Sequence, residues 1–119
     1  MIGHLDDAKR LGNRAFEYST HYPGVAAYAL HLLGDIAAHP DRLDADSGEA
    51  LYRQALTLAE RRGMRPLIGH CHFSLGRLDR RTGKQGRAQE HLGIATALYR
   101  EMDMTYWLDL AATEMGQLL

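Results

Sequence analysis

Apolar residues recur at steps of three and four along most of the chain, the spacing that places side chains on one face of an α-helix. Ala88, Leu92 and Ala95 form one such set, four and then three positions apart. No stretch alternates apolar and polar residues for long enough to predict a β-strand. The pattern predicts an all-α fold of about six helices, at 3–20, 25–38, 47–62, 66–81, 84–102 and 105–118.

Helix-breaking residues separate the predicted helices. All three prolines lie at or between predicted helix ends, where a missing backbone N–H costs no helical hydrogen bond. Gly63 and Gly83 follow predicted helices, at the position where a glycine most often ends one. The polar stretch 39–47 is predicted to be a loop, and we expect Asp46 or Ser47 to cap the helix that follows it.

The helical pattern repeats with a period of about 40 residues, and two motifs alternate within it. The first is a leucine or methionine followed by glycine, at Leu33-Gly34, Leu75-Gly76 and Met115-Gly116. The second is a set of three residues at steps of four and three, at Ala8-Gly12-Ala15, Gly48-Tyr52-Ala55 and Ala88-Leu92-Ala95. Corresponding residues lie 40 positions apart, except for 42 positions between Leu33 and Leu75. This alternation indicates a solenoid of helical hairpins.

The arrangement resembles the tetratricopeptide repeat, a hairpin whose first helix carries a leucine–glycine pair and whose second carries Ala, a large apolar residue and Ala. The resemblance implies a tetratricopeptide-like αα-superhelix, a right-handed solenoid of antiparallel helices. It also implies that the first helix of each pair lines a concave groove. A standard repeat has about 34 residues, so the longer period here predicts longer helices or longer turns.

The segment from Ala50 to Leu110 is also similar to the C-terminal repeats of large bacterial signalling proteins, which combine a nucleotide cyclase domain, an ATPase module and helical repeats. The residues that carry this similarity are Tyr52-Arg53-Gln54-Ala55-Leu56, Leu58-Ala59-Glu60, Gly63-Met64-Arg65-Pro66-Leu67, His70-Cys71-His72, Leu75-Gly76-Arg77-Leu78, Arg81-Thr82-Gly83, Ala88, His91-Leu92, 97–104 and Trp107-Leu108. Asp79 departs from the repeat pattern, which usually has a large aromatic residue or leucine there. Neither the cyclase nor the ATPase domain lies in this sequence.

Both ends of the chain lack a partner helix. The pattern begins on the second helix of a pair and ends on a first helix. Solenoids normally close with a polar capping helix, whereas the last predicted helix carries Trp107 and several leucines. We therefore expect a single repeat domain over 1–119 that is a piece of a longer protein, or whose exposed ends pack on another copy.

The composition argues against several classes of protein. A net charge of −1 lacks the basic excess that binding to nucleic-acid phosphates requires. No apolar run approaches the roughly 18–20 residues that span a membrane, and the first residues lack the features of a secretory signal. The single cysteine, Cys71, cannot form an internal disulfide. We expect a cytoplasmic protein that binds neither nucleic acid nor membrane.

No set of residues predicts catalysis, a cofactor or a metal site. His70 and His72 flank Cys71, but residues two apart on a helix point about 200° apart, so the two histidines cannot share a metal. The stretch 83–86 has the composition of a phosphate loop but lies in a helix–helix turn and lacks the required spacing. Four glutamates are expected to lie on solvated helix faces, namely Glu60, Glu90, Glu101 and Glu114. The chain is therefore predicted not to be an enzyme.

The concave groove implied by the repeat resemblance is the candidate binding site. Its positions, counted from Leu33, Leu75 and Met115, are Tyr28, His31, Asp35, His70, Phe73, Arg77, Arg80, Leu110, Thr113 and Gln117. We expect Phe73, flanked by Arg77 and Arg80, to anchor an acidic or C-terminal peptide, because arginine pairs bidentately with carboxylates. The alternative is that Phe73 packs inward and both arginines are solvated. A chaperone-tail ligand is not expected, since His31 and Asp35 occupy two positions where that clamp needs Lys and Asn.

Two functions remain open on these grounds. The first is a non-catalytic interaction scaffold that binds a protein or peptide partner, or a neighbouring domain, through its concave groove. The second is a regulatory or self-association module of a larger bacterial nucleotide cyclase or ATPase signalling protein. In that case the uncapped end helices, including Trp107, make the contact, and a homo-oligomer is one form it takes.

Overall fold

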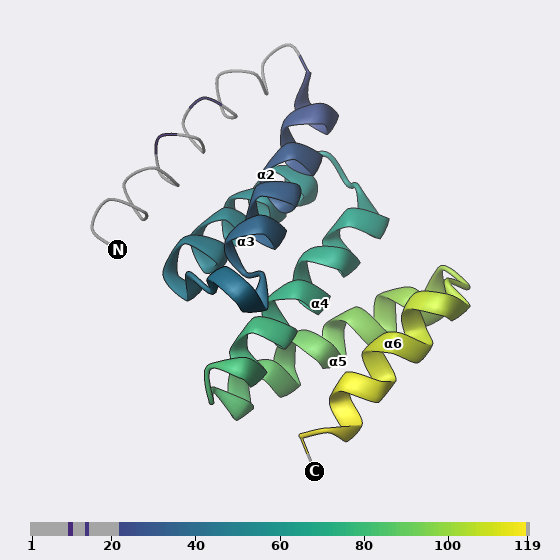
Figure 1. Ribbon diagram of the computed structural model, residues 1–119. Helices are drawn as coiled ribbons and strands as arrows, with labels where there is room; N and C mark the ends of the chain where they lie inside the picture. The colour runs from purple at the N-terminus through teal and green to yellow at the C-terminus, as the bar shows by residue number, and fades with distance from the viewer. Residues whose placement is uncertain (1–9, 11–13, 15–21, 119) are drawn as a thin grey trace. The chain divides into compact units, whose positions relative to one another are not determined.

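All the secondary structure in the described part of the chain is helical (Figure 1). The computed structural model describes residues 10, 14 and 22–118, so the predicted helix at 3–20 lies outside them apart from Arg10 and Arg14. The α-helices are α2 (Pro23–Ala37), α3 (Ala45–Arg61), α4 (Arg65–Arg81), α5 (Gln85–Glu101) and α6 (Thr105–Gly116), and a short 3-10 helix, η1 (Pro40–Arg42), follows α2. Each predicted helix in this part agrees with the observed one to within two residues at both ends.

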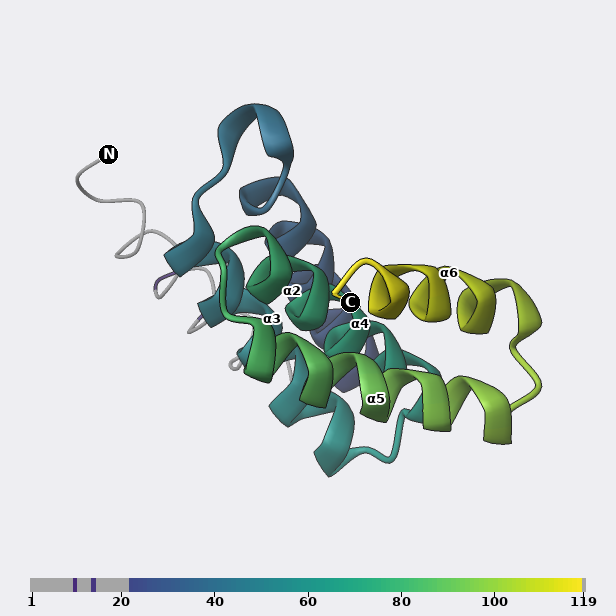
Figure 2. The ribbon, with the colours of Figure 1, turned by 90° about the horizontal axis from the view of Figure 1, so that it is seen from below.

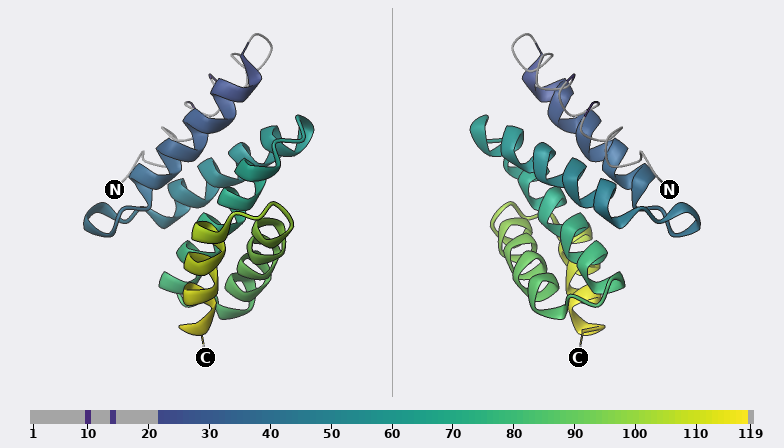
Figure 3. Two further views of the ribbon diagram at one scale, coloured as in Figure 1. Left: turned by 90° about the vertical axis from the view of Figure 1, so that its right-hand side faces the viewer. Right: turned by 90° about the vertical axis from the view of Figure 1, so that its left-hand side faces the viewer.

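The chain divides into two compact units, Met1–Met64 and Arg65–Leu119. In the first unit, α2 and α3 pack against each other as a hairpin (Figure 3). In the second, α5 packs against both α4 and α6, and Figure 2 shows α5 and α6 running alongside each other. Packing between helices that are neighbours in sequence is the arrangement expected of a helical repeat.

A glycine on the first helix of each hairpin allows close approach of the second helix. A methyl group at Gly34 would lie 2.6 Å from the ring of Tyr52, and one at Gly76 would lie 2.6 Å from Cγ of Leu92. Both distances are far below van der Waals contact, so only glycine fits. The two pairs occupy equivalent positions in the sequence repeat, which gives the repeated leucine–glycine motif a physical reason in both units.

Three turns spaced 20 residues apart end α3, α4 and α5 in the same way. Each has one residue with positive φ, namely Gly63 (64°), Gly83 (81°) and Asp103 (54°). In each, the next amide donates to a carbonyl five positions earlier: Met64 to Ala59, Lys84 to Asp79 and Met104 to Tyr99. This is the Schellman arrangement that satisfies carbonyls at a helix end. The prediction that Gly63 and Gly83 end helices is therefore confirmed, and Asp103 serves the same role without being glycine.

The cap at the start of α3 differs from the predicted one. Asp44 accepts a hydrogen bond from the Ser47 amide at 3.2 Å and another from the Ser47 hydroxyl at 2.9 Å. The prediction that Asp46 or Ser47 is the cap was wrong, because the helix begins earlier and both lie in its first turn. The carboxylate of Asp44 thus satisfies amides that the helix itself leaves unpaired.

The core of the second unit is aromatic and joins all three of its helices. Its buried members are Phe73, Leu92, Ala95, Tyr99 and Ala111. Phe73 meets Tyr99 and Trp107 edge to face, with centroids 6.3 and 6.2 Å apart. Such pairs add about 0.5–1.5 kcal/mol to the gain from burial. This cluster fixes α6 on α5 and thereby sets where the C-terminal side chains lie.

The hairpin of the first unit leaves part of its apolar surface exposed. Ala26, Ala27 and Leu30 of α2 are buried. The other side of the helix carries exposed Val25, Tyr28, Leu32 and Ile36.

No helix in the described part of the chain combines the length and the apolar character needed to cross a bilayer.

Candidate functional site

Two arginines of α4 face one glutamate of α6 in the second unit. Nε of Arg80 donates to Oε2 of Glu114 at 2.7 Å, and Nε of Arg77 lies 3.4 Å from Oε1 of the same carboxylate. Arg77 and Arg80 lie three residues apart, and therefore on one side of α4. Their side chains are 43% and 30% exposed, whereas that of Glu114 is only 16% exposed. We call Arg77, Arg80 and Glu114 the arginine surface.

The buried ring of Phe73 packs against the arginine surface on the side of the core. It is only 4% exposed and belongs to the core of the second unit. The guanidinium carbon of Arg77 lies 5.4 Å from the centroid of the Phe73 ring, within cation–π range. Phe73 therefore packs inward, as the alternative interpretation held, while the arginines are held by an ion pair and a ring rather than merely solvated.

The charges of the arginine surface do not balance. Arg80 forms a hydrogen bond with Glu114, but the buried Nε of Arg77 has no hydrogen-bond partner, since its 3.4 Å contact is an ion pair without hydrogen-bond geometry. Two guanidinium groups thus share one carboxylate. A second carboxylate could pair with the terminal guanidinium nitrogens of Arg77, because the side chain is 43% exposed and a guanidinium offers five donors in all.

Glu114 is the site residue that sequence reasoning missed. We expected it on a solvated face, and that prediction was wrong because it pairs with both arginines across the α4–α6 boundary. In the repeat register Glu114 corresponds to Ser74 and Leu32, so the repeat itself offers no signal for a charge there. Only the packing of α6 onto α5 brings it to α4.

His70 lies on the same helix as the arginine surface but is engaged in the core. Its Nδ1 lies 2.7 Å from the hydroxyl of Tyr99, and its ring packs edge to face on Trp107 at 4.5 Å. Burial, with a smaller contribution from Cys71, raises the pKa of the Tyr99 hydroxyl. Tyr99 therefore keeps its proton at neutral pH, and the His70 tautomer sets which of the two groups donates in this hydrogen bond.

Three of the predicted groove residues lie on α2 in the first unit. The carboxylate of Asp35 accepts a 2.6 Å hydrogen bond from the Tyr52 hydroxyl and lies 3.6 Å from Nδ1 of His31. The His31 ring packs on Tyr52 at 5.4 Å. Tyr28 is exposed. Here the structure brings together an acidic and aromatic group, in contrast to the cationic group at Arg77 and Arg80.

Of the remaining three predicted residues, Leu110 and Thr113 lie on α6 and Gln117 caps its C-terminal end. Leu110, Thr113 and Gln117 are exposed. The Thr113 hydroxyl donates to the backbone carbonyl of Asp109 at 2.9 Å, and the Gln117 amide closes the helix end. The hydrogen bond and ion pairs of Arg77 and Arg80 with this part of the chain go to Glu114 instead.

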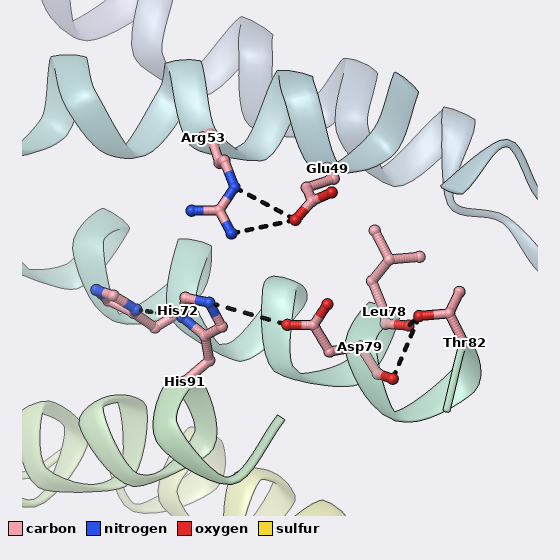
Figure 4. A network of polar contacts seen from close by, with 7 residues as sticks. All are labelled: Glu49, Arg53, His72, Leu78, Asp79, Thr82 and His91. Carbon is pink, nitrogen blue, oxygen red and sulfur yellow. Dashed lines mark hydrogen bonds and ion pairs between the residues drawn. The ribbon is translucent and has the colours of Figure 1, made fainter. Parts of the chain in front are cut away.

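A polar cluster links α4 to α5 within the second unit (Figure 4). Nδ1 of His72 lies 2.9 Å from Nδ1 of His91, and Nε2 of His91 lies 3.9 Å from buried Asp79. One imidazole must donate and the other accept, and a proton on Nε2 of His91, toward Asp79, leaves its Nδ1 to accept from His72. Asp79, the departure from the repeat pattern, is therefore matched by a histidine. Figure 4 also shows the pairing of Arg53 with Glu49 along α3.

The cluster does not form a metal site. In the described part of the chain, no three His, Cys, Asp or Glu side chains lie together in a way that could hold a metal ion. Cys71 is buried, and His70 and His72 contact different residues of α5, Tyr99 and His91. Comparison of the chain with protein-family models, curated proteins and solved structures finds no match.

Proposed function

We propose that this chain is a non-catalytic protein-interaction module of tetratricopeptide type, a right-handed superhelix of about six helices that acts in the cytoplasm. Its partner is a peptide or neighbouring domain that carries carboxylates. The observation that supports this proposal best is the arginine surface, where two partly exposed guanidinium groups share one carboxylate. Arginine is suited to this role, because its planar fork matches the geometry of a carboxylate.

The arrangement of the second unit favours recognition over a purely structural ion pair. Partly exposed ion pairs contribute only about 0–1 kcal/mol to stability, so the three charges are not needed to hold α6 in place. The aromatic core beneath them does that through Phe73, Tyr99 and Trp107. Because this core holds α6, either arginine can pair with a carboxylate of a ligand in place of Glu114 without loss of the fold.

A peptide titration tests the proposal. Fluorescence anisotropy of a fluorescein-labelled hexaglutamate peptide is measured with the wild-type chain and with Arg77→Glu. We expect Arg77→Glu to weaken binding by at least tenfold and to leave the mass in solution unchanged. Arg100→Glu is the matched control, because Arg100 is exposed in the last turn of α5, at the other end of the α4–α5 hairpin. Equal affinities for all three proteins would contradict the proposal.

Self-association within a larger bacterial cyclase or ATPase protein is a second candidate. One observation favours it: Tyr106 of α6 is 69% exposed, and Leu110, one turn later, is 37% exposed. Trp107 packs into the core instead, so Tyr106 would be the contact residue. Light scattering from micromolar to millimolar concentration tests this candidate. A dimer that Tyr106→Lys abolishes would support it, and a monomer throughout would exclude it for the isolated chain.

A further inference from the structure

We infer that Glu114 is a built-in competitor that occupies the arginine surface until an acidic partner replaces it. This inference rests on the proposed function, because it assigns a regulatory role to a residue of the same site. Glu114 supplies the one carboxylate that Arg77 and Arg80 share. The ligand class is a peptide whose side-chain or terminal carboxylate makes the contacts that Glu114 makes in the free protein.

The first argument is chemical identity. Glu114 presents to Arg80 the group that an acidic ligand would present, at 2.7 Å from Nε. Its second oxygen faces Arg77 at 3.4 Å without forming a hydrogen bond. The internal carboxylate thus satisfies one arginine well and the other poorly. An external carboxylate can approach the exposed outer part of the Arg77 side chain, which is 43% exposed, although the buried Nε stays out of its reach.

The second argument is electrostatic. Glu114 cancels one of the two positive charges and lies where a bound carboxylate would approach, so its own charge repels the ligand. Its side chain is 16% exposed, less than either arginine, so this repulsion is screened less by solvent than that between fully exposed groups. Removing the charge of Glu114 while keeping its shape should therefore strengthen binding.

The third argument is mechanical. Glu114 has three rotatable bonds to its carboxylate and stands on α6, whose position is fixed by the core residues Trp107 and Ala111. The side chain can swing away while the helix remains in place. The aromatic core holds α6 independently of the ion pairs, so displacement of Glu114 by a multivalent acidic peptide leaves the fold in place.

Peptide binding to Glu114→Gln tests the inference. The probe is the labelled hexaglutamate peptide, measured by anisotropy with the wild type, Glu114→Gln and the control Asp109→Asn. Both substitutions remove one negative charge from α6, but Asp109 is exposed, and the ion pairs of both arginines are made with Glu114. We expect Glu114→Gln to strengthen binding about tenfold and Asp109→Asn to change it by less than twofold. Circular dichroism of each variant checks that the total helical content is unchanged, and Glu114→Ala serves in its place if Glu114→Gln does not fold.

The outcomes separate this inference from the proposed function. If the wild type binds and Glu114→Gln binds equally or more weakly, Glu114 positions the arginines instead and the inference is overturned. Equal strengthening by both variants would also overturn it, because net charge alone would then explain the change. If no variant binds the peptide, the proposed function fails as well. Binding by Glu114→Gln alone would support both.

Discussion

At the residue scale, the positive-φ turns show how single positions decide the path of the chain. Gly83 has φ of 81° and nothing within 4 Å of the place where a Cβ would be, so backbone strain alone opposes a side chain there. We expect Gly83→Ala to lower the free energy of unfolding by about 1 kcal/mol. Gly86→Ala is the control, since Gly86 lies in the first turns of α5 with open space around it and ordinary φ, and should stabilise by about 0.5 kcal/mol. Urea denaturation followed by circular dichroism measures both.

Burial of the Tyr99 hydroxyl makes the free energy of unfolding decrease at alkaline pH. Burial raises its pKa in the folded state, so the folded chain retains a proton that the unfolded chain loses near the ordinary tyrosine pKa of about 10. The unfolded state then binds fewer protons, and the free energy of unfolding falls as pH rises above about 10. Tyr99→Phe should be less stable at neutral pH, because the hydrogen bond with His70 is lost, and should lose less stability between pH 9 and 11.

The control for this prediction is Tyr106→Phe, because the Tyr106 side chain is exposed. Urea unfolding at several pH values gives the slope for each protein. A wild-type slope between pH 9 and 11 that Tyr99→Phe leaves unchanged would show that another group is responsible.

At the element scale, the contact between α4 and α5 depends on a missing side chain. A Cβ at Gly76 would lie 2.6 Å from Cγ and 3.3 Å from the backbone nitrogen of Leu92, so the helices would have to separate. We expect Gly76→Ala to destabilise the chain by about 1–3 kcal/mol, as overpacking does. Gly93→Ala is matched in residue type and helical setting, but its nearest new contact is 3.9 Å away, at Cε of Met115. We expect the melting temperature of Gly76→Ala, measured by thermal denaturation, to lie several degrees below that of Gly93→Ala.

The sequence predicts the helices better than it predicts their contacts. Helix ends follow from prolines, glycines and three-to-four spacing, which are local, and the observed ends agree to within two residues in the described part. The cap of α3 was missed because Asp44, Asp46 and Ser47 are all good capping residues, and the choice depends on where the helix begins. The pairs His72–His91 and Arg80–Glu114 join residues 19 and 34 positions apart, and no periodic pattern encodes which side chains meet across helices.

The candidate site was predicted in part for the same reason. Arg77 and Arg80 lie on one side of α4, as their spacing of three implies, and they do meet a carboxylate. That carboxylate is internal, which only the packing of α6 could show. Phe73 could be placed near them by its spacing of four from Arg77, but its burial depends on Tyr99 and Trp107, far along the chain.

At the scale of the whole molecule, those of the described helices that pack closely are neighbours in sequence: α2 with α3, α4 with α5, and α5 with α6. Mostly local contacts favour fast folding and a stability that is close to a sum over hairpins. The net charge of −1 gives no long-range attraction for an acidic peptide, so recognition must come from the arginine surface itself. We therefore expect the affinity for hexaglutamate to fall about tenfold between 50 and 500 mM NaCl, as measured by anisotropy. An affinity independent of salt would contradict an arginine–carboxylate contact.

The most direct test of the account is to map where an acidic peptide binds. The ¹⁵N-labelled chain is titrated with hexaglutamate, and backbone amide and arginine Nε–H signals are followed by NMR. We predict that the largest shifts occur at Arg77, Arg80 and Glu114, with the Nε–H signals of both arginines moving together. Shifts confined to α2 and α3, or to the exposed face around Tyr106, would contradict the assignment of the arginine surface as the binding site.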